Sequence, residues 1–281
     1  MRSRKWLVRF GLVLLLAVVV FAGQGWRAPQ PVRAAAETVI KIMPLGDSIT
    51  AGTDASYTAL LFTSYRCLLY QKLVAAGYSF DFVGSVHGQW GNNDRTLLPP
   101  PGYCTWPDYD EEGHSGYRID DILAGADSWP GELQTWAASA HPDLVLVYLG
   151  TVDLLQNESV ASTVDGISQV IDTLRAANPR VRILVAQISP ASKDGVGGSE
   201  LTTIPQFDDL LPALVAAKTR TQSPILTVDM HSSFSVGAHT LDGVHPNATA
   251  EDKQSNRWKT GIDLIMSLDS HYSTFIPTLV K

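Results

Sequence analysis

Apolar runs typical of buried strands alternate along this chain with segments whose apolar residues recur at helical spacing. The strand-like runs lie at 38–46, 78–84, 143–150, 180–188 and 224–230. The helical patterns lie at 57–77, 160–179, 206–220 and 247–268, and we expect Pro212 to break or begin the third of them. Apolar strands that are separated by helices predict an α/β protein with a parallel sheet covered on both faces.

The carboxyl ends of these strands indicate where a functional site would lie, because open parallel sheets bind ligands outside those ends. Four such exits stand out in the sequence. They are the turn 46–48, the loop that ends at Gly116, the segment 150–153 and the loop after Met230.

Ser48 directly follows the first predicted strand, within MPLGDSITAG. Gly46 allows a tight turn, and a helical turn that begins near Ser48 would direct its first free N–H groups at the site. A nucleophilic serine needs both an exposed hydroxyl and such an N–H for the oxyanion. The alternative is that Ser48 only caps a helix.

Asp242 and His245 lie three residues apart in TLDGVHPNA, just before the last predicted helix. In a turn, this spacing lets the carboxylate reach the imidazole Nδ1–H and leaves Nε2 free to take a proton from a serine. An ordinary capping pair is the alternative. His114 is a rival histidine, but no carboxylate stands at a comparably clear spacing to orient it, so we expect it to be a loop or substrate-contact residue.

Four short blocks resemble those of SGNH (GDSL-type) hydrolases in their order and approximate spacing. They are GDS at 46–48, the glycine of GHSGYR at 116, GTVD at 150–153 and DGVH at 242–245. The sequence around these blocks is most similar to that of acetyl xylan esterases of carbohydrate esterase family three. The segments that carry this similarity are KIMPLGDSIT, SYR, FDFVGS, EGHSGYRIDDI and PDLVLVYLGT. The resemblance implies a three-layer αβα fold with a five-stranded parallel sheet, the flavodoxin-like SGNH hydrolase fold.

The resemblance also implies site residues. Ser48 would be the nucleophile, His245 the base and Asp242 the acid that orients it. The backbone N–H groups of Ser48 and Gly116 would be oxyanion donors, although Gly116 by itself could equally be an ordinary turn glycine.

The chain departs from the family pattern at Val152. SGNH hydrolases have an asparagine at this place, whose side chain donates a hydrogen bond to the oxyanion, whereas Val152 offers only its backbone N–H. Loss of one such donor typically costs about 100- to 1000-fold in turnover. We therefore expect a slowed esterase. Thr151 and Gln187 are candidates for a substitute donor, and we expect Asp153 to secure the loop by accepting bonds from backbone N–H groups.

The segment 85–116 is a long loop rich in glycine, proline and aromatic residues, and loops of this length are usually functional. Its aromatic residues either stack on sugar rings or pack the loop itself; they are Trp90, Tyr103, Trp106 and Tyr109. As substrate contacts we predict Asp47, His114 and Trp106.

The two cysteines are Cys67, in a predicted helix, and Cys104, in the long loop. Outside the cell they could form a disulfide that joins this loop to the helix. The alternative is two unpaired thiols. Two cysteines so far apart make no zinc signature, and we expect no metal and no other cofactor.

The N-terminus has a basic segment, MRSRKWLVRF, followed by the apolar GLVLLLAVVVFAG, which is typical of a signal peptide. We predict a signal peptide at 1–36, one SGNH hydrolase domain at 37–281, and secretion, with an uncleaved membrane anchor as the alternative. Losing the six basic residues of 1–36 would change the formal net charge from −7 to −13. Such a negative charge argues against nucleic acid and anionic membranes as partners, because both bind positively charged proteins.

Together these observations predict a secreted, metal-free, monomeric serine esterase that acts on acetylated polysaccharide such as xylan or on small esters. Two alternatives remain open. One is a catalytically silent carbohydrate-binding protein on the same fold, and the other is an SGNH lipase or thioesterase. The predicted mature chain has no long amphipathic apolar stretch for a lipid-facing lid, which favours a short acyl group on a polar carrier.

Overall fold

The computed structural model describes residues 39–52, 64–88, 104–125, 132–268 and 279–280. The chain divides into two units, Met1–Glu37 and Thr38–Lys281, and the described residues all belong to the second. Three sequence predictions therefore lie outside the described residues: the signal peptide, the first part of the helix predicted at 57–77, and the roles of Trp90 and Tyr103.

A parallel β-sheet occupies the middle of this unit, with strand order β2-β1-β4-β5-β6-β7 and with β3 paired beside β1. The strands are β1 Ile40–Gly46, β2 Phe80–Phe82, β3 Glu112–Gly113, β4 Leu144–Tyr148, β5 Arg182–Gln187, β6 Ile225–Asp229 and β7 Leu279–Val280. Five of them are the predicted strands. The sheet differs from the expected five-stranded one by β3 and β7, which have two residues each and are too short to show a periodic pattern.

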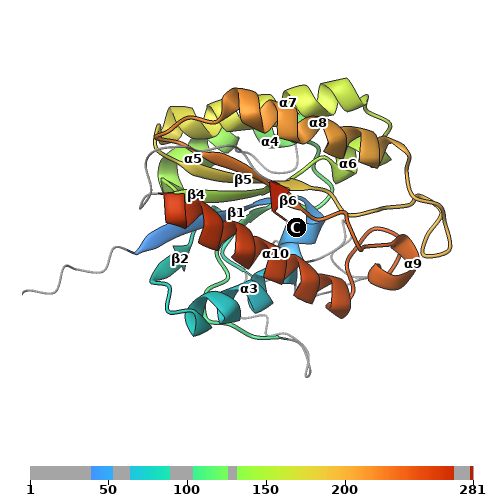
Figure 1. Cartoon of the computed structure of the whole chain (residues 1–281), viewed down its shortest axis with the longest axis horizontal. Helices are drawn as coiled ribbons and strands as arrows, with labels where there is room; N and C mark the ends of the chain where they lie inside the picture. Colours follow the sequence, from blue (N-terminus) through green and yellow to red (C-terminus); the bar gives the residue numbers. More distant parts are fainter. Residues whose placement is uncertain (1–38, 53–63, 89–103, 126–131, 269–278, 281) are drawn as a thin grey trace, which may run out of the picture. The chain divides into compact units, whose positions relative to one another are not determined.

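Helices cover both faces of the sheet, which confirms the predicted three-layer αβα architecture (Figure 1). On one face, α3 Ser64–Ala75 packs against α10 Ala248–Ser267. The other face carries α4 Ile119–Ala124, α5 Leu133–Ala140, α7 Val160–Ala177 and α8 Thr203–Lys218. Every residue of β4 and β6 is buried, which explains the continuous apolar run of β4 and the mostly apolar sequence of β6, where Thr227 and Asp229 are the polar exceptions.

The prediction that Pro212 breaks or begins a helix is wrong, because α8 begins at Thr203 and continues through Pro212 to Lys218. Proline lacks an N–H, so the helix cannot satisfy the carbonyl of Asp208, four residues earlier. The Gln187 side chain, at the end of β5, donates to that carbonyl over 3.0 Å instead. A tertiary contact thus compensates for the missing helical hydrogen bond.

A disulfide joins Cys67 of α3 to Cys104 in the long loop, which confirms the predicted pairing. The bond closes a sequence separation of 37 residues. It therefore fixes part of the 85–116 segment to α3.

Three short helices begin soon after strands end at one edge of the sheet. They are α2 Ser48–Ala51 after β1, α6 Thr151–Leu155 after β4 and α9 Val236–His239 after β6. All the strand pairs are parallel, so these helices share the carboxyl edge where the sequence predicted a site.

Candidate active site

Ser48 is the first residue of α2 and is held in a tight turn after β1. The turn needs glycine at position 46, because a Cβ there would lie 2.2 Å from Oγ1 of Thr50. Asp47 caps the helix, since its Oδ1 accepts a hydrogen bond from the N–H of Ile49 over 2.9 Å. The turn therefore places Ser48 at the very start of the helix with 6% of its surface exposed.

Asp242 and His245 lie in a closed turn between α9 and α10. The N–H of Leu241 donates to the carbonyl of His245 over 2.7 Å, which closes the turn. Gly243 has a φ of +104°, a conformation that glycine adopts without strain. One carboxylate oxygen of Asp242 accepts the backbone N–H groups of Val244 and His245 over 2.9 and 2.8 Å.

The structure brings Ser48, His245 and Asp242 into one hydrogen-bonded chain. His245 Nδ1 lies 2.7 Å from Oδ2 of Asp242, and His245 Nε2 lies 2.9 Å from Oγ of Ser48. A carboxylate only accepts, so the imidazole proton lies on Nδ1 and Nε2 accepts from the serine hydroxyl. This is the arrangement of a nucleophile with its general base and orienting acid.

Asp242 is a carboxylate over the whole working range of such a site. Partial burial by itself raises its pKa, but the hydrogen bonds that it accepts from the side chain and backbone of His245 lower the pKa to about 2. The ionised carboxylate can therefore stabilise an imidazolium at neutral pH.

Gly116 and Val152 leave the same sheet edge as Ser48. Gly46 pairs with Gly113 on β3 and with Tyr148 on β4, so the segments that carry Gly116 and Val152 emerge on either side of the nucleophile turn. Gly116 has a φ of +80°, which favours glycine. No hydrogen bond from the N–H of Ser48 or Gly116 to another described group is present, so both can serve an oxyanion.

Asp153 accepts a hydrogen bond over 3.2 Å from the N–H of Ile119, the first residue of α4, so the expected bond to a backbone N–H is made to that helix and not within the 150–153 loop. Ile119 lies three residues after Gly116, so this contact ties the third block of the sequence to the second. Burial raises the pKa of Asp153 to about 6.

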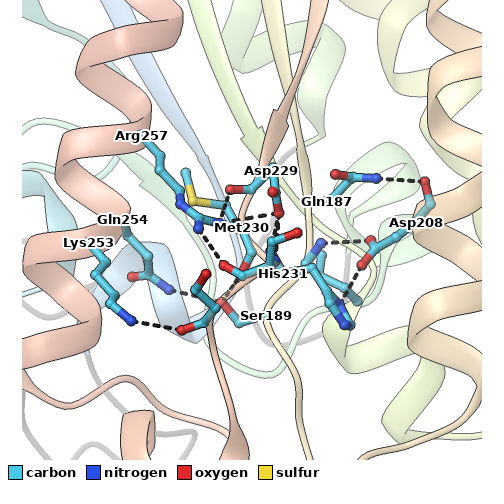
Figure 2. Close-up of polar contacts among 12 residues, drawn as sticks. Gln187, Ser189, Asp208, Asp229, Met230, His231, Lys253, Gln254 and Arg257 are labelled. Carbon is cyan, nitrogen blue, oxygen red and sulfur yellow. Dashed lines mark hydrogen bonds and ion pairs between the residues drawn. The ribbon is translucent and has the colours of Figure 1, made fainter. Parts of the chain in front are cut away.

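Gln187 is unsuited to replace the missing asparagine, because its amide donates to the carbonyl of Asp208 in the interior (Figure 2). Thr151 is 2% exposed, and its hydroxyl has no hydrogen-bond partner among the described residues. Of the two candidates for a substitute donor, only Thr151 therefore has an uncommitted donor within the described structure.

The predicted substrate contacts are mostly buried. Trp106 is 5% exposed and packs edge-on against Tyr109 with ring centroids 4.6 Å apart, which favours the alternative in which these aromatics pack the loop. His114 is also 5% exposed and stacks on Trp136. Asp47 is 1% exposed. Contact of these three side chains with substrate stays a prediction.

The expectation that no carboxylate orients His114 is wrong. Nε2 of His114 lies 2.7 Å from Oε1 of the buried Glu112, which also accepts from the hydroxyl of Ser85. Glu112 and His114 are two residues apart along an extended segment, where alternate side chains share a face. The short strand β3 was not predicted, so this local pair was missed.

The loop 189–202 supports the catalytic turn, which the sequence did not indicate. The N–H of Ser192 donates to the carbonyl of Gly243 over 2.8 Å. A Cβ at Gly243 would lie 2.7 Å from the backbone of Gly195, so the two glycines allow the loop and the turn to approach closely. Nε2 of His231 lies 3.3 Å from the carboxylate of Glu200 in this loop, and its Nδ1 lies 2.9 Å from the carboxylate of Asp208 in α8, so His231 links the loop to that helix.

Asp47 gives the first testable prediction, because its second oxygen is buried without a hydrogen-bond partner among the described residues. Burial raises its pKa to about 6, so between about pH 4 and 6 the folded chain keeps a proton that the unfolded chain has lost. Proton binding by Asp47 stabilises the folded state below this window. About 2–3 kcal/mol of that stabilisation is lost as the pH rises through it. Asp47→Asn cannot titrate. We therefore expect its thermal unfolding midpoint, minus that of wild type at the same pH, to be several degrees higher at pH 7.5 than at pH 4.5.

Calorimetry or circular dichroism at the two pH values measures this difference. Asp209→Asn is the matched control, because Asp209 is exposed on α8. A midpoint difference for Asp47→Asn that does not change with pH would contradict the raised pKa of the buried Asp47 carboxyl.

Comparisons with known proteins identify the family. The model of the GDSL-like lipase/acylhydrolase family matches residues 45–253. A multidomain esterase of Ruminococcus flavefaciens is 28% identical over 244 residues, which are 83% of this chain but only 30% of that protein.

Two solved structures extend the match to the fold. A family 3 carbohydrate esterase of Clostridium thermocellum is 30% identical with a TM-score of 0.62, and the match covers 82% of this chain and 99% of that one. An acetyl esterase mutant with acetate ion is 29% identical with a TM-score of 0.63, covering 83% and 99%.

No described helix has the length and apolar character needed to cross a membrane. Within the described residues, no three or more His, Cys, Asp and Glu side chains are grouped so as to hold a metal ion. The family match spans most of the sequence, and the chain therefore belongs to the GDSL-like lipase/acylhydrolase family and is a carboxylic ester hydrolase of the SGNH type.

Proposed function

We propose that this chain is an exported serine esterase that removes acetyl groups from a polysaccharide such as xylan, with an oxyanion hole weakened at Val152. The observation that carries the proposal is the hydrogen-bonded chain from Ser48 through His245 to Asp242. The relatives named as an acetyl esterase and as carbohydrate esterases support the acetyl group and the carbohydrate carrier.

In this proposal, Oγ of Ser48 attacks the ester carbonyl while Nε2 of His245 takes the hydroxyl proton. Asp242 stabilises the imidazolium that forms, and the N–H groups of Ser48 and Gly116 bind the oxyanion. The imidazolium then gives its proton to the sugar oxygen, which leaves as the alcohol. Water, activated by the same imidazole, hydrolyses the acetyl-enzyme and releases acetate.

The acyl preference follows from the surroundings of the site. Among the described residues, Val196 and Leu241 are the exposed large apolar side chains in the loop 189–202 and in the turn that carries Asp242 and His245. A long acyl chain needs extended apolar surface to offset its hydration, whereas an acetyl group needs little.

The test is hydrolysis by the purified protein of 4-nitrophenyl acetate and 4-nitrophenyl octanoate, together with acetate release from acetylated xylan. We expect kcat/KM to be at least tenfold higher for acetate than for octanoate, and acetate release from the polymer in proportion to enzyme. Chemically deacetylated xylan is the matched blank. Faster turnover of the octanoyl ester, or no release from the polymer, would refute the proposed substrate.

A further inference from the structure

The short helix that carries Ser48 is held at its carboxyl end by the first residues of α3. The last carbonyls of a helix have no intrahelical donor. Here the carbonyl of Ile49 accepts from the hydroxyl of Ser64 over 3.0 Å. The carbonyls of Thr50 and Ala51 accept from Nε and Nη2 of Arg66 over 2.7 and 3.0 Å. One guanidinium therefore fixes the last two peptide groups of the nucleophile helix.

The same guanidinium also binds the segment that leads to Gly116. Its Nη1 donates to the carbonyl of Tyr109 over 3.1 Å, and its Nη2 lies 3.1 Å from the carboxylate of Glu111. The side chains of both Arg66 and Glu111 are completely buried. Trp106 lies against the guanidinium, 5.5 Å from the ring centroid.

From Glu111 the chain runs directly to the second oxyanion residue. Glu112 and Gly113 pair with the end of β1, and the N–H of His114 donates to the carbonyl of Gly46 over 2.9 Å. A Cβ at Gly113 would lie 2.6 Å from the backbone of Ala51, so this segment lies directly on the nucleophile helix. Arg66 thus connects the two backbone segments that carry the N–H groups of Ser48 and Gly116.

We propose that Arg66 is a positioning residue that holds the two backbone oxyanion donors in register across the site. The inference rests on the proposed function. It gives Arg66 a task that only a guanidinium performs, because the group is planar and presents five donors in a fixed geometry. A lysine ammonium in the same place reaches fewer of these acceptors and orients them less. With no asparagine at position 152, the hole depends more heavily on these two backbone donors.

A purely structural role is the competing explanation, and the chain offers a matched control for it. Arg175 is also buried and donates to the hydroxyl and the carbonyl of Ser223 over 2.9 and 2.7 Å. Ser223 lies just before β6, at the sheet edge opposite the site. Arg175→Met therefore reports the cost of losing a buried arginine that is remote from the catalytic residues.

The experiment compares Arg66→Lys, the double variant Arg66→Met with Glu111→Leu, and Arg175→Met. The double variant leaves no unpaired buried charge, which would by itself be strongly destabilising. Rates on 4-nitrophenyl acetate are measured per mole of folded protein, well below each unfolding midpoint. For both Arg66 variants we expect kcat to fall about tenfold to 100-fold, the scale of an ångström-sized misplacement, while KM stays within twofold. Arg175→Met should lower only the unfolding midpoint.

An unchanged kcat in the Arg66 variants, or an equal loss in Arg175→Met, would overturn the inference. If wild type and Ser48→Ala are equally inactive, the proposed function fails. Amide hydrogen exchange then tests separately whether Arg66 holds the two backbone segments. Faster exchange at both 48–52 and 109–116 in the Arg66 variants, and in neither segment for Arg175→Met, supports the connection between the two segments. Exchange that stays at the wild-type rate in either segment overturns it.

Discussion

Replacing Ser48 by alanine is expected to lower acetyl-ester hydrolysis by about a million-fold, the loss seen when the nucleophile of a serine triad is removed. The hydroxyl of Ser48 lies 2.9 Å from Nε2 of His245, as a nucleophile that gives its proton to this histidine must. His245 would keep its bond to Asp242, and the turn would keep its cap from Asp47. The variant should therefore fold normally while covalent catalysis is lost.

Labelling with a fluorophosphonate probe, followed by mass spectrometry, measures the reactivity of the Ser48 hydroxyl directly. Wild type should take up one equivalent at Ser48, and Ser48→Ala should take up none. Ser235→Ala is a suitable control, because Ser235 is an exposed serine at the start of α9 and lies outside the catalytic contacts. Turnover of Ser48→Ala at the wild-type rate would show that another group performs the hydrolysis.

Val152→Asn is expected to raise kcat for 4-nitrophenyl acetate by about 100-fold, the lower end of what one oxyanion donor contributes. Val152 is the second residue of α6, and its segment emerges beside the nucleophile turn. Its side chain is partly buried but, among the described residues, is not one of those that pack on the hydrophobic core. An asparagine amide at this position would add a side-chain donor without opening a cavity in the core.

Leu155→Asn is the matched control, since Leu155 is also partly buried in α6 and lies three residues further along. It should leave kcat unchanged within about twofold. If Val152→Asn raises kcat with KM unchanged, the new interaction is made in the transition state. If Val152→Asn is no faster than wild type, the site already has a full set of donors, and the uncommitted hydroxyl of Thr151 is the first to replace with valine.

Much of the fold and of the candidate catalytic set follows from patterns that are local in the sequence. The central strands are mostly apolar because both faces of the sheet are covered, and α7 between two of them keeps its amphipathic spacing. Asp242 and His245 could be paired because three residues in a tight turn bring the carboxylate to Nδ1 without help from the rest of the chain. The place of Ser48 followed from Gly46 and the end of β1, which are its neighbours in sequence.

Very short elements, and contacts between residues far apart in the chain, could not be predicted from the sequence. The strand β3 has two residues, so the pairing of Glu112 with His114 gave no periodic signal. The continuity of α8 through Pro212 depended on a donor from another element, the amide of Gln187. That same contact removed Gln187 from the candidates for an oxyanion donor.

The sequence by itself determined the parallel α/β architecture, the candidate catalytic trio and the absence of an asparagine at position 152. Only the tertiary structure decided that Trp106 and His114 are buried and that Arg66 joins two segments more than 40 residues apart in sequence. The physical reason is that periodicity and turn spacing act over a few residues, whereas a buried polar group takes whichever partner the packed chain brings within hydrogen-bond distance.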